Sequence, residues 1–279
     1  MSSIGASAIL DRIMEKQMIE SSETLALRRW FYGEGLLTEA DADALLRANA
    51  ALRIANPEFD RYLVETLCDF IVYQQRPTGR ITAEKASWLI DRLGGSEGLV
   101  ATKAELDLLV AVVEEAHEVP AELAAFALAQ VKHAAITGEG PAARGRIHFS
   151  RTVDAGDVEL LDRLLHRGAK AGSPVSRAEA EVLFEIADAC TGENDEAWDE
   201  LFVGAIAGHL VGAALPASGE LDVDFDGHEP VESGSADWLD DRIHCDGRIS
   251  RSERALLAFI NRRPAIQDPA ARAAIIRMA

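Results

Sequence analysis

The chain has 279 residues, 48% of them hydrophobic, and a formal net charge of −19 at pH 7. A chain of this length and composition can fill sizeable cores, which argues against extensive disorder and favours two ordinary domains over one large domain. Its negative charge repels phosphate backbones and anionic lipid head groups. We therefore expect no nucleic-acid partner and no membrane insertion, and we expect a protein partner with a basic surface.

The cysteines and the start of the chain indicate the compartment. Cys68, Cys190 and Cys245 are scattered and odd in number, which favours buried thiols in a reducing environment over a disulfide framework. The first residues lack a basic segment followed by an unbroken apolar run, which is the pattern of a secretory signal. The apolar stretch 201–217 contains His209 and Pro216, so we interpret it as a buried helix. The expected location is cytoplasmic.

The pattern predicts an all-α protein, because strand-forming residues are sparse beside Ala, Leu, Glu and Arg. Apolar residues recur at helical spacing over 6–20, and a second short helix should end near residue 33. Further helices are expected over 38–53, from 56 past 71, over 82–93, from 102, over 120–137 and over 153–167. Thr38, Thr82 and Thr102 are the expected N-caps.

The pattern then restarts, which predicts an internal duplication. Ser176 aligns with Thr38 as an N-cap, the stripe from Trp198 aligns with that from Phe59, and Glu253 aligns with Glu105. We therefore expect two related helical-bundle halves made of short helix-loop-helix units. The expected parts are an N-terminal helical addition over 1–34, a first half over 35–137, a Gly- and Pro-rich linker over 138–151, and a second half over 152–279 with an acidic insertion over 217–236.

Three tryptophans and one histidine in the apolar stripes are interpreted as core residues without a catalytic role. Trp88, Trp198 and Trp238 are expected to be core anchors. His209 replaces an apolar residue of the first half, so we expect a hydrogen-bonded core histidine and not a catalytic base.

The acidic insertion contains a candidate divalent-cation site. Asp222, Asp224 and Asp226, followed by Gly227, have the spacing of the first half of an EF-hand calcium loop, in which alternate carboxylates converge on one cation. The second half of that loop does not fit, because a proline interrupts it and Glu232 comes one place early. The site would take Ca²⁺ or Mg²⁺, and the alternative is a solvated acidic loop without metal.

The stretch 238–260 resembles the same loop from its other end. Its Asp246-Gly247 turn, an aliphatic residue two places on and Glu253 suit the second half of an EF-hand, but the early ligand positions hold Arg242 and His244. The run Cys245-Asp-Gly-Arg-Ile-Ser-Arg-Ser-Glu253 also resembles the Asp-Gly-x-aliphatic-Ser-x-x-Glu signature of tellurite-resistance TerB-like and DjlA N-terminal-like helical domains. It departs from that signature where the family often has Ala before Asp.

The resemblance implies a compact all-α bundle in which Asp246 and Glu253 lie near a metal. It supplies no reaction, and the sequence does not separate it from a degenerate EF-hand. A third interpretation needs no ligand, because Ser250 as N-cap with Glu253 three residues later makes a capping box.

No set of residues in the sequence matches both a catalytic motif and the secondary structure that the motif requires. Gly94-Gly-Ser96-Glu-Gly98 matches a nucleophile elbow, but the preceding residues are expected to be helical and that turn requires a strand. We therefore expect a non-enzymatic, acidic helical interaction or scaffold protein with a candidate cation site. The alternatives are a cation-responsive regulator and, with less support, a metal-dependent enzyme.

Overall fold

The computed structural model describes residues 3–34, 37–54, 56–143, 151–170, 174–212, 233–245 and 247–262. Across these ranges the chain forms helices α1 to α12 and no strand, apart from a single isolated bridge between Arg80 and Glu118. This confirms the prediction of an all-α protein. The chain divides into two compact units, Met1–Leu123 and Ala124–Ala279.

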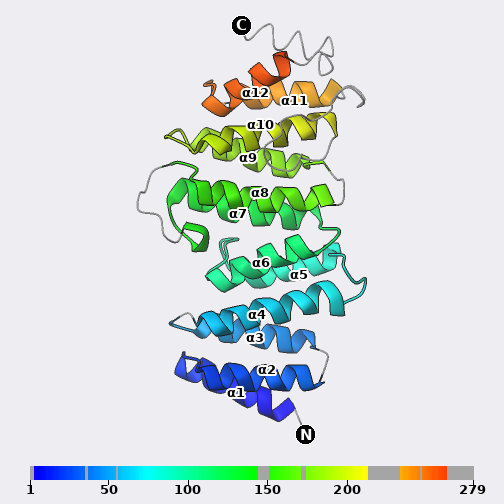
Figure 1. Cartoon of the computed structure of the whole chain (residues 1–279), viewed down its shortest axis with the longest axis vertical. Coiled ribbons are helices and arrows are strands. Elements are labelled where there is room, and N and C mark those ends of the chain that lie inside the picture. The colour runs from blue at the N-terminus through cyan, green and yellow to red at the C-terminus, as the bar shows by residue number, and fades with distance from the viewer. Residues whose placement is uncertain are drawn as a thin grey trace. The chain divides into compact units, whose positions relative to one another are not determined.

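Unit 1 is built from consecutive helix pairs, which Figure 1 shows as successive layers. Helices α1 and α2 contact each other, α3 packs on α1, and α4 packs on α2, α3 and α6. Helix α4 therefore has contacts with helices on both sides of it in the chain order. The elements are α1 (Ser3–Lys16), α2 (Ser21–Glu34), α3 (Glu39–Ala51), α4 (Pro57–Asp69), η1 (Phe70–Gln74), α5 (Ala83–Leu93) and α6 (Lys103–Glu115).

Unit 2 repeats this way of packing around one central helix. Helix α10 contacts α8, α9 and α12, and an ion pair between Lys132 and Glu185 joins α7 to α9. Almost all of α7 belongs to this unit. The elements are α7 (Ala121–Thr137), η2 (Pro141–Ala143), α8 (Ala155–Lys170), α9 (Arg177–Ala189), α10 (Glu196–Val211), α11 (Ser233–Ile243) and α12 (Arg251–Asn261).

Aromatic side chains form the centre of unit 2. The Phe184 ring meets Phe202 and Trp238 edge-on, with centroids 5.1 and 5.7 Å apart, and Trp198 is fully buried beside Phe202. Such pairs stabilise a core beyond the area that they bury. The core assignments of Trp198 and Trp238 are thus confirmed. Trp88, in unit 1, is only half-buried.

His209 also follows its predicted role. Its Nδ1 lies 2.7 Å from the carbonyl oxygen of Val175, and its ring meets the Trp238 ring edge-on at 5.1 Å. The histidine is therefore half-buried and hydrogen-bonded, and it contacts the core of unit 2 through Trp238.

The helix starts follow the predicted N-caps. Thr38, Thr82 and Thr102 accept hydrogen bonds from the first turns of α3, α5 and α6, and Ser176 does so for α9. Such caps satisfy backbone N–H groups that have no partner inside the helix. The duplication and its boundaries stay predictions.

The end of α4 differs from the predicted continuous stripe. Residues 70–74 form a turn of π-helix, in which the Gln75 N–H donates to the Phe70 carbonyl at 3.1 Å. The buried Lys85 ammonium donates to four carbonyl oxygens of this turn and the loop after it, at 2.9 to 3.0 Å, and burial lowers its pKa. A lysine of α5 thus supplies hydrogen-bond donors where the ordinary helix ends.

No helix in the described part of the chain is both long and apolar enough to span a bilayer. Of the apolar stretch predicted as a buried helix, residues 201–211 belong to α10, most of whose residues are buried, and residues 213–217 lie outside the described residues.

Candidate functional site

Most of the predicted metal ligands fall outside the residues that the structure describes. Asp222, Asp224, Asp226 and Glu232 all precede the first described residue of α11, and Asp246 lies in the gap after residue 245. Within the described ranges, no three His, Cys, Asp or Glu side chains gather closely enough to hold a metal ion. The Ca²⁺ or Mg²⁺ site therefore stays a prediction.

Glu253 is the one predicted ligand that the structure describes, and it caps α12. Its carboxylate accepts the Ser250 N–H at 2.6 Å, and the Ser250 hydroxyl accepts the Glu253 N–H at 3.2 Å. Only 1% of Glu253 is exposed. The capping-box interpretation of these two residues is confirmed.

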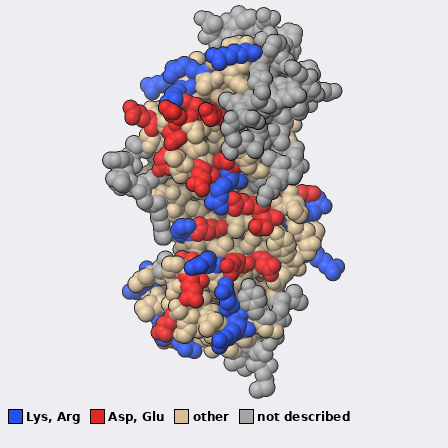
Figure 2. All heavy atoms as spheres, in the orientation of Figure 1, with Lys and Arg blue, Asp and Glu red and all other residues tan. Residues whose placement is uncertain are grey.

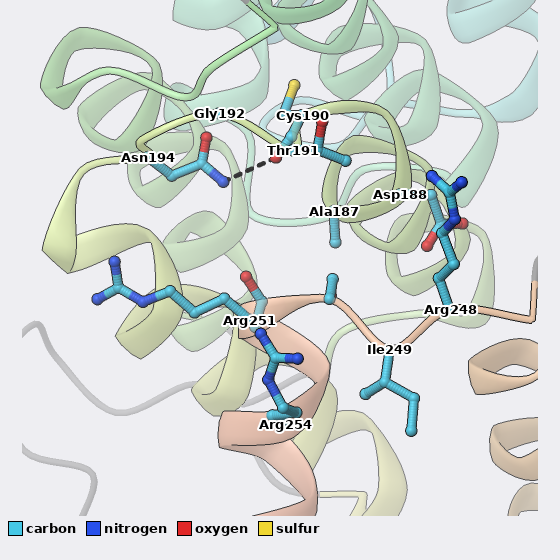
Figure 3. A pocket seen from close by; sticks show the side chains of 12 residues that line it. Ala187, Asp188, Cys190, Thr191, Gly192, Asn194, Arg248, Ile249, Arg251 and Arg254 are labelled. Atoms are coloured by element: carbon cyan, nitrogen blue, oxygen red, sulfur yellow. Dashed lines mark hydrogen bonds between the residues drawn. The ribbon is translucent and has the colours of Figure 1, made fainter.

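A hollow of about 280 Å³ lies beside this cap, between the loop that follows α9 and the start of α12. Three arginines, Arg248, Arg251 and Arg254, line it from the α12 side, as Figure 3 shows. Asp188 and Asn194 line it from the other side. This hollow is the candidate functional site.

The start of α12 is fixed to α10 by one carboxylate. Asp199 accepts the Ser252 hydroxyl at 2.7 Å and pairs with the Arg251 guanidinium at 2.7 Å. The Asp199 side chain is only 15% exposed, so this pair is better shielded from solvent than a surface ion pair. These two contacts hold the first turn of α12, which forms one wall of the hollow, against α10.

The opposite wall is held by Asn194. Its side-chain amide donates to the Cys190 carbonyl at 2.9 Å, and its amide oxygen accepts the Val153 N–H at the same distance. This closes the loop after α9 and ties it to the residues before α8. In Figure 3 the Cys190 sulfur points away from the hollow and the Arg248 guanidinium lies beside Asp188.

A charged network behind the hollow joins α9 to α11. Arg242 pairs with Glu181 at 3.1 Å and with Asp188 at 3.0 Å, and its side chain is only 15% exposed. Glu181 also accepts the indole N–H of Trp238 at 2.6 Å. The Asp188 carboxylate, which lines the hollow, therefore already forms an ion pair with Arg242 of α11.

Cys245 contacts two members of this network, Arg242 and Asp188. An Arg242 N–H donates to its sulfur at 2.8 Å, and the sulfur lies 3.9 Å from an Asp188 oxygen. The prediction of buried thiols is wrong for Cys245, which is exposed just after the end of α11 and has a cation in direct contact.

The lining of the hollow is cationic, since three arginines stand against one aspartate, a formal charge of +2. Figure 2 shows Lys and Arg side chains gathered over α12, in a chain that is strongly acidic as a whole. Sequence reasoning missed this site. The three-residue spacing of Arg248, Arg251 and Arg254 is the signal in the sequence that indicates it.

Comparison with known families, with curated proteins and with solved structures found no match to this chain. The resemblance to TerB-like and DjlA N-terminal-like domains accordingly remains a prediction from the sequence.

Proposed function

We propose that this chain is an acidic helical scaffold that binds a protein partner through exposed side chains on the loops between its helices. The observation that carries this proposal is an apolar pair in unit 1. Met18 and Ile54 are 51% and 70% exposed, although both residues are large and hydrophobic. Exposed apolar surface that is held in place is typical of protein–protein contacts.

The two loops that display this pair are joined by hydrogen bonds. The Arg53 N–H donates to the Gln17 carbonyl at 3.1 Å, and the Asn56 side chain donates to the Ile19 carbonyl at 3.2 Å. A surface that is ordered before binding loses less entropy when a partner docks. Glu20 in the first of these loops and Glu58 in the first turn of α4 are exposed and would complement a partner with a basic surface.

The test is capture of a partner by the full chain with a photo-crosslinking residue at the neighbouring exposed position 53. We expect one protein to be crosslinked in a saturable way, and Met18→Ser with Ile54→Ser to reduce its capture at least tenfold. Leu25→Ser is the matched control, because Leu25 is also apolar and is 45% exposed, on α2. Equal capture by the double variant and the parent would refute the proposal.

The same assay separates the cation-responsive alternative. A scaffold should capture its partner equally in Ca²⁺ and in chelator. Capture that requires Ca²⁺ and disappears when Asp222, Asp224 and Asp226 are changed to Asn would favour the regulator.

A further inference from the structure

We propose that the arginine-lined hollow at the start of α12 binds a phosphorylated side chain of a partner protein. The inference rests on the proposed scaffold function and gives it a second, chemically specific contact. It starts from two observations, the hollow itself and the three guanidinium groups that line it.

The charge of the lining selects the ligand. A phosphate ester carries about −1.5 to −2 at neutral pH and has three strong acceptor oxygens, and so matches a lining of three arginines and one aspartate. Asp199, which lies outside the lining, already offsets the charge of Arg251. Guanidinium groups also match phosphate geometry, because they donate two parallel N–H bonds to paired oxygens.

The arginines of the lining differ in whether an ion pair already orients their side chains. Arg251 is oriented by its pair with Asp199, while 63% of its side chain is exposed. Arg254 is exposed and makes no ion pair with any residue in the described ranges. Arg254 is therefore the residue whose charge is best able to respond to an added anion.

The rest of the molecule argues for a single phosphate and against a polyanion. At physiological salt, charges farther apart than about 8 Å are largely screened, so one phosphate in the hollow interacts mainly with the local arginines. A nucleic acid would extend over the acidic surface of a chain with a net charge of −19. The hollow therefore suits a phosphorylated protein segment better than a nucleic acid.

The test follows the arginine Nε–Hε signals of the full chain by NMR. The probes are inorganic phosphate and a blocked pentapeptide, Ala-Ala-phosphoserine-Ala-Ala, with the unphosphorylated and Asp-containing peptides for comparison. We expect saturable shifts at Arg248, Arg251 and Arg254 with the phosphopeptide, and affinity at least tenfold lower for the unphosphorylated peptide.

Two substitutions of Arg254 test whether this residue contributes to phosphopeptide binding. R254E should weaken phosphopeptide binding at least tenfold, and R254Q should weaken it less while leaving the melting temperature unchanged. R61E is the matched control, because Arg61 is an exposed helical arginine of unit 1 that makes no ion pair within the described residues. Its affinity should stay within twofold of the parent.

Several outcomes would overturn the proposal. They are shifts that grow linearly without saturation, equal binding by R254E and the parent, binding of phosphate without binding of the phosphopeptide, and tighter Arg254-dependent binding of a thymidine 12-mer. Because the scaffold test reads capture at Met18 and Ile54 in the other unit, either proposal can fail while the other holds.

Discussion

At the scale of single residues, Lys85 has the most demanding environment. Its ammonium is buried and serves four backbone carbonyls that the π-turn and the next loop leave without helical partners. Lys85→Met keeps much of the side-chain volume but removes every donor. Leaving buried acceptors without partners costs about 1–3 kcal/mol for each group, so we expect a loss of about 3 kcal/mol after partial relaxation.

Chemical denaturation of Lys85→Met measures this loss. Lys103→Met is its control, because Lys103 is exposed and, among the described residues, pairs only with Asp107, one turn along the same helix. Such a pair contributes about 0.3–0.5 kcal/mol. Similar losses in the two variants would show that the carbonyl contacts of Lys85 contribute little.

The three cysteines are predicted to differ sharply in reactivity. Cys245 is exposed, whereas Cys68 and Cys190 are buried. Burial, and next the charge of Glu115, raise the pKa of Cys68 from 9.0 to about 12. With Ellman's reagent at pH 8 we expect one fast thiol in the native protein, none in Cys245→Ser, and three in the unfolded parent.

The Cys68 pKa also gives a pH dependence with a definite sign. Its folded value lies above the unfolded value of 9.0, so the folded state holds this proton more tightly. The stability linked to this proton is complete below pH 9 and is lost as pH rises from 9 towards 12. Cys68→Ala should therefore lose less stability than the parent between pH 8 and 11, and an equal loss in both would contradict the assignment.

At the scale of elements, two capping boxes of unit 1 differ in what else they bind. Asp41 caps α3 at the surface and serves its own N-cap, Thr38. Glu105 caps α6 while 5% exposed, and it also accepts the Asn49 side-chain amide of α3 at 3.2 Å. The Glu105 box therefore joins two helices, and the Asp41 box stabilises one.

Thermal and urea unfolding should separate the two boxes. We expect Asp41→Ala to cost about 1 kcal/mol, the usual value of a cap. Glu105→Ala should cost about 3 kcal/mol, because it also leaves the buried Asn49 amide without one of its acceptors. The prediction fails if Asp41→Ala costs as much as Glu105→Ala.

The helix starts could be predicted from the sequence and the hollow could not, for one physical reason. N-caps such as Thr102 and Ser250 act on backbone groups two or three residues away, so local spacing is enough to find them. The hollow joins residues 188–194 to residues 248–254, and the contacts of Lys85 depend on a π-turn more than ten residues earlier. Such features depend on packing between helices that no local pattern encodes.

At the scale of the whole molecule, the excess of negative charge opposes folding. The chain carries 47 acidic and 28 basic residues. Several of the ion pairs between them, such as Arg28–Glu65 and Lys103–Asp107, are about half exposed and contribute at most about 1 kcal/mol each. We therefore expect repulsion among unpaired carboxylates to outweigh the attraction within surface pairs.

Salt should consequently stabilise this protein. Raising ionic strength from about 0.01 M to about 1 M shortens the Debye length from about 30 Å to about 3 Å, which removes most long-range repulsion. We expect the melting temperature to rise over this range. The matched variant replaces Glu20, Glu97 and Glu193 with Gln, since all three are exposed and make no ion pair within the described residues. It should melt above the parent in low salt, and the two should converge in high salt; a parent whose melting temperature falls with salt would show that its ion pairs prevail.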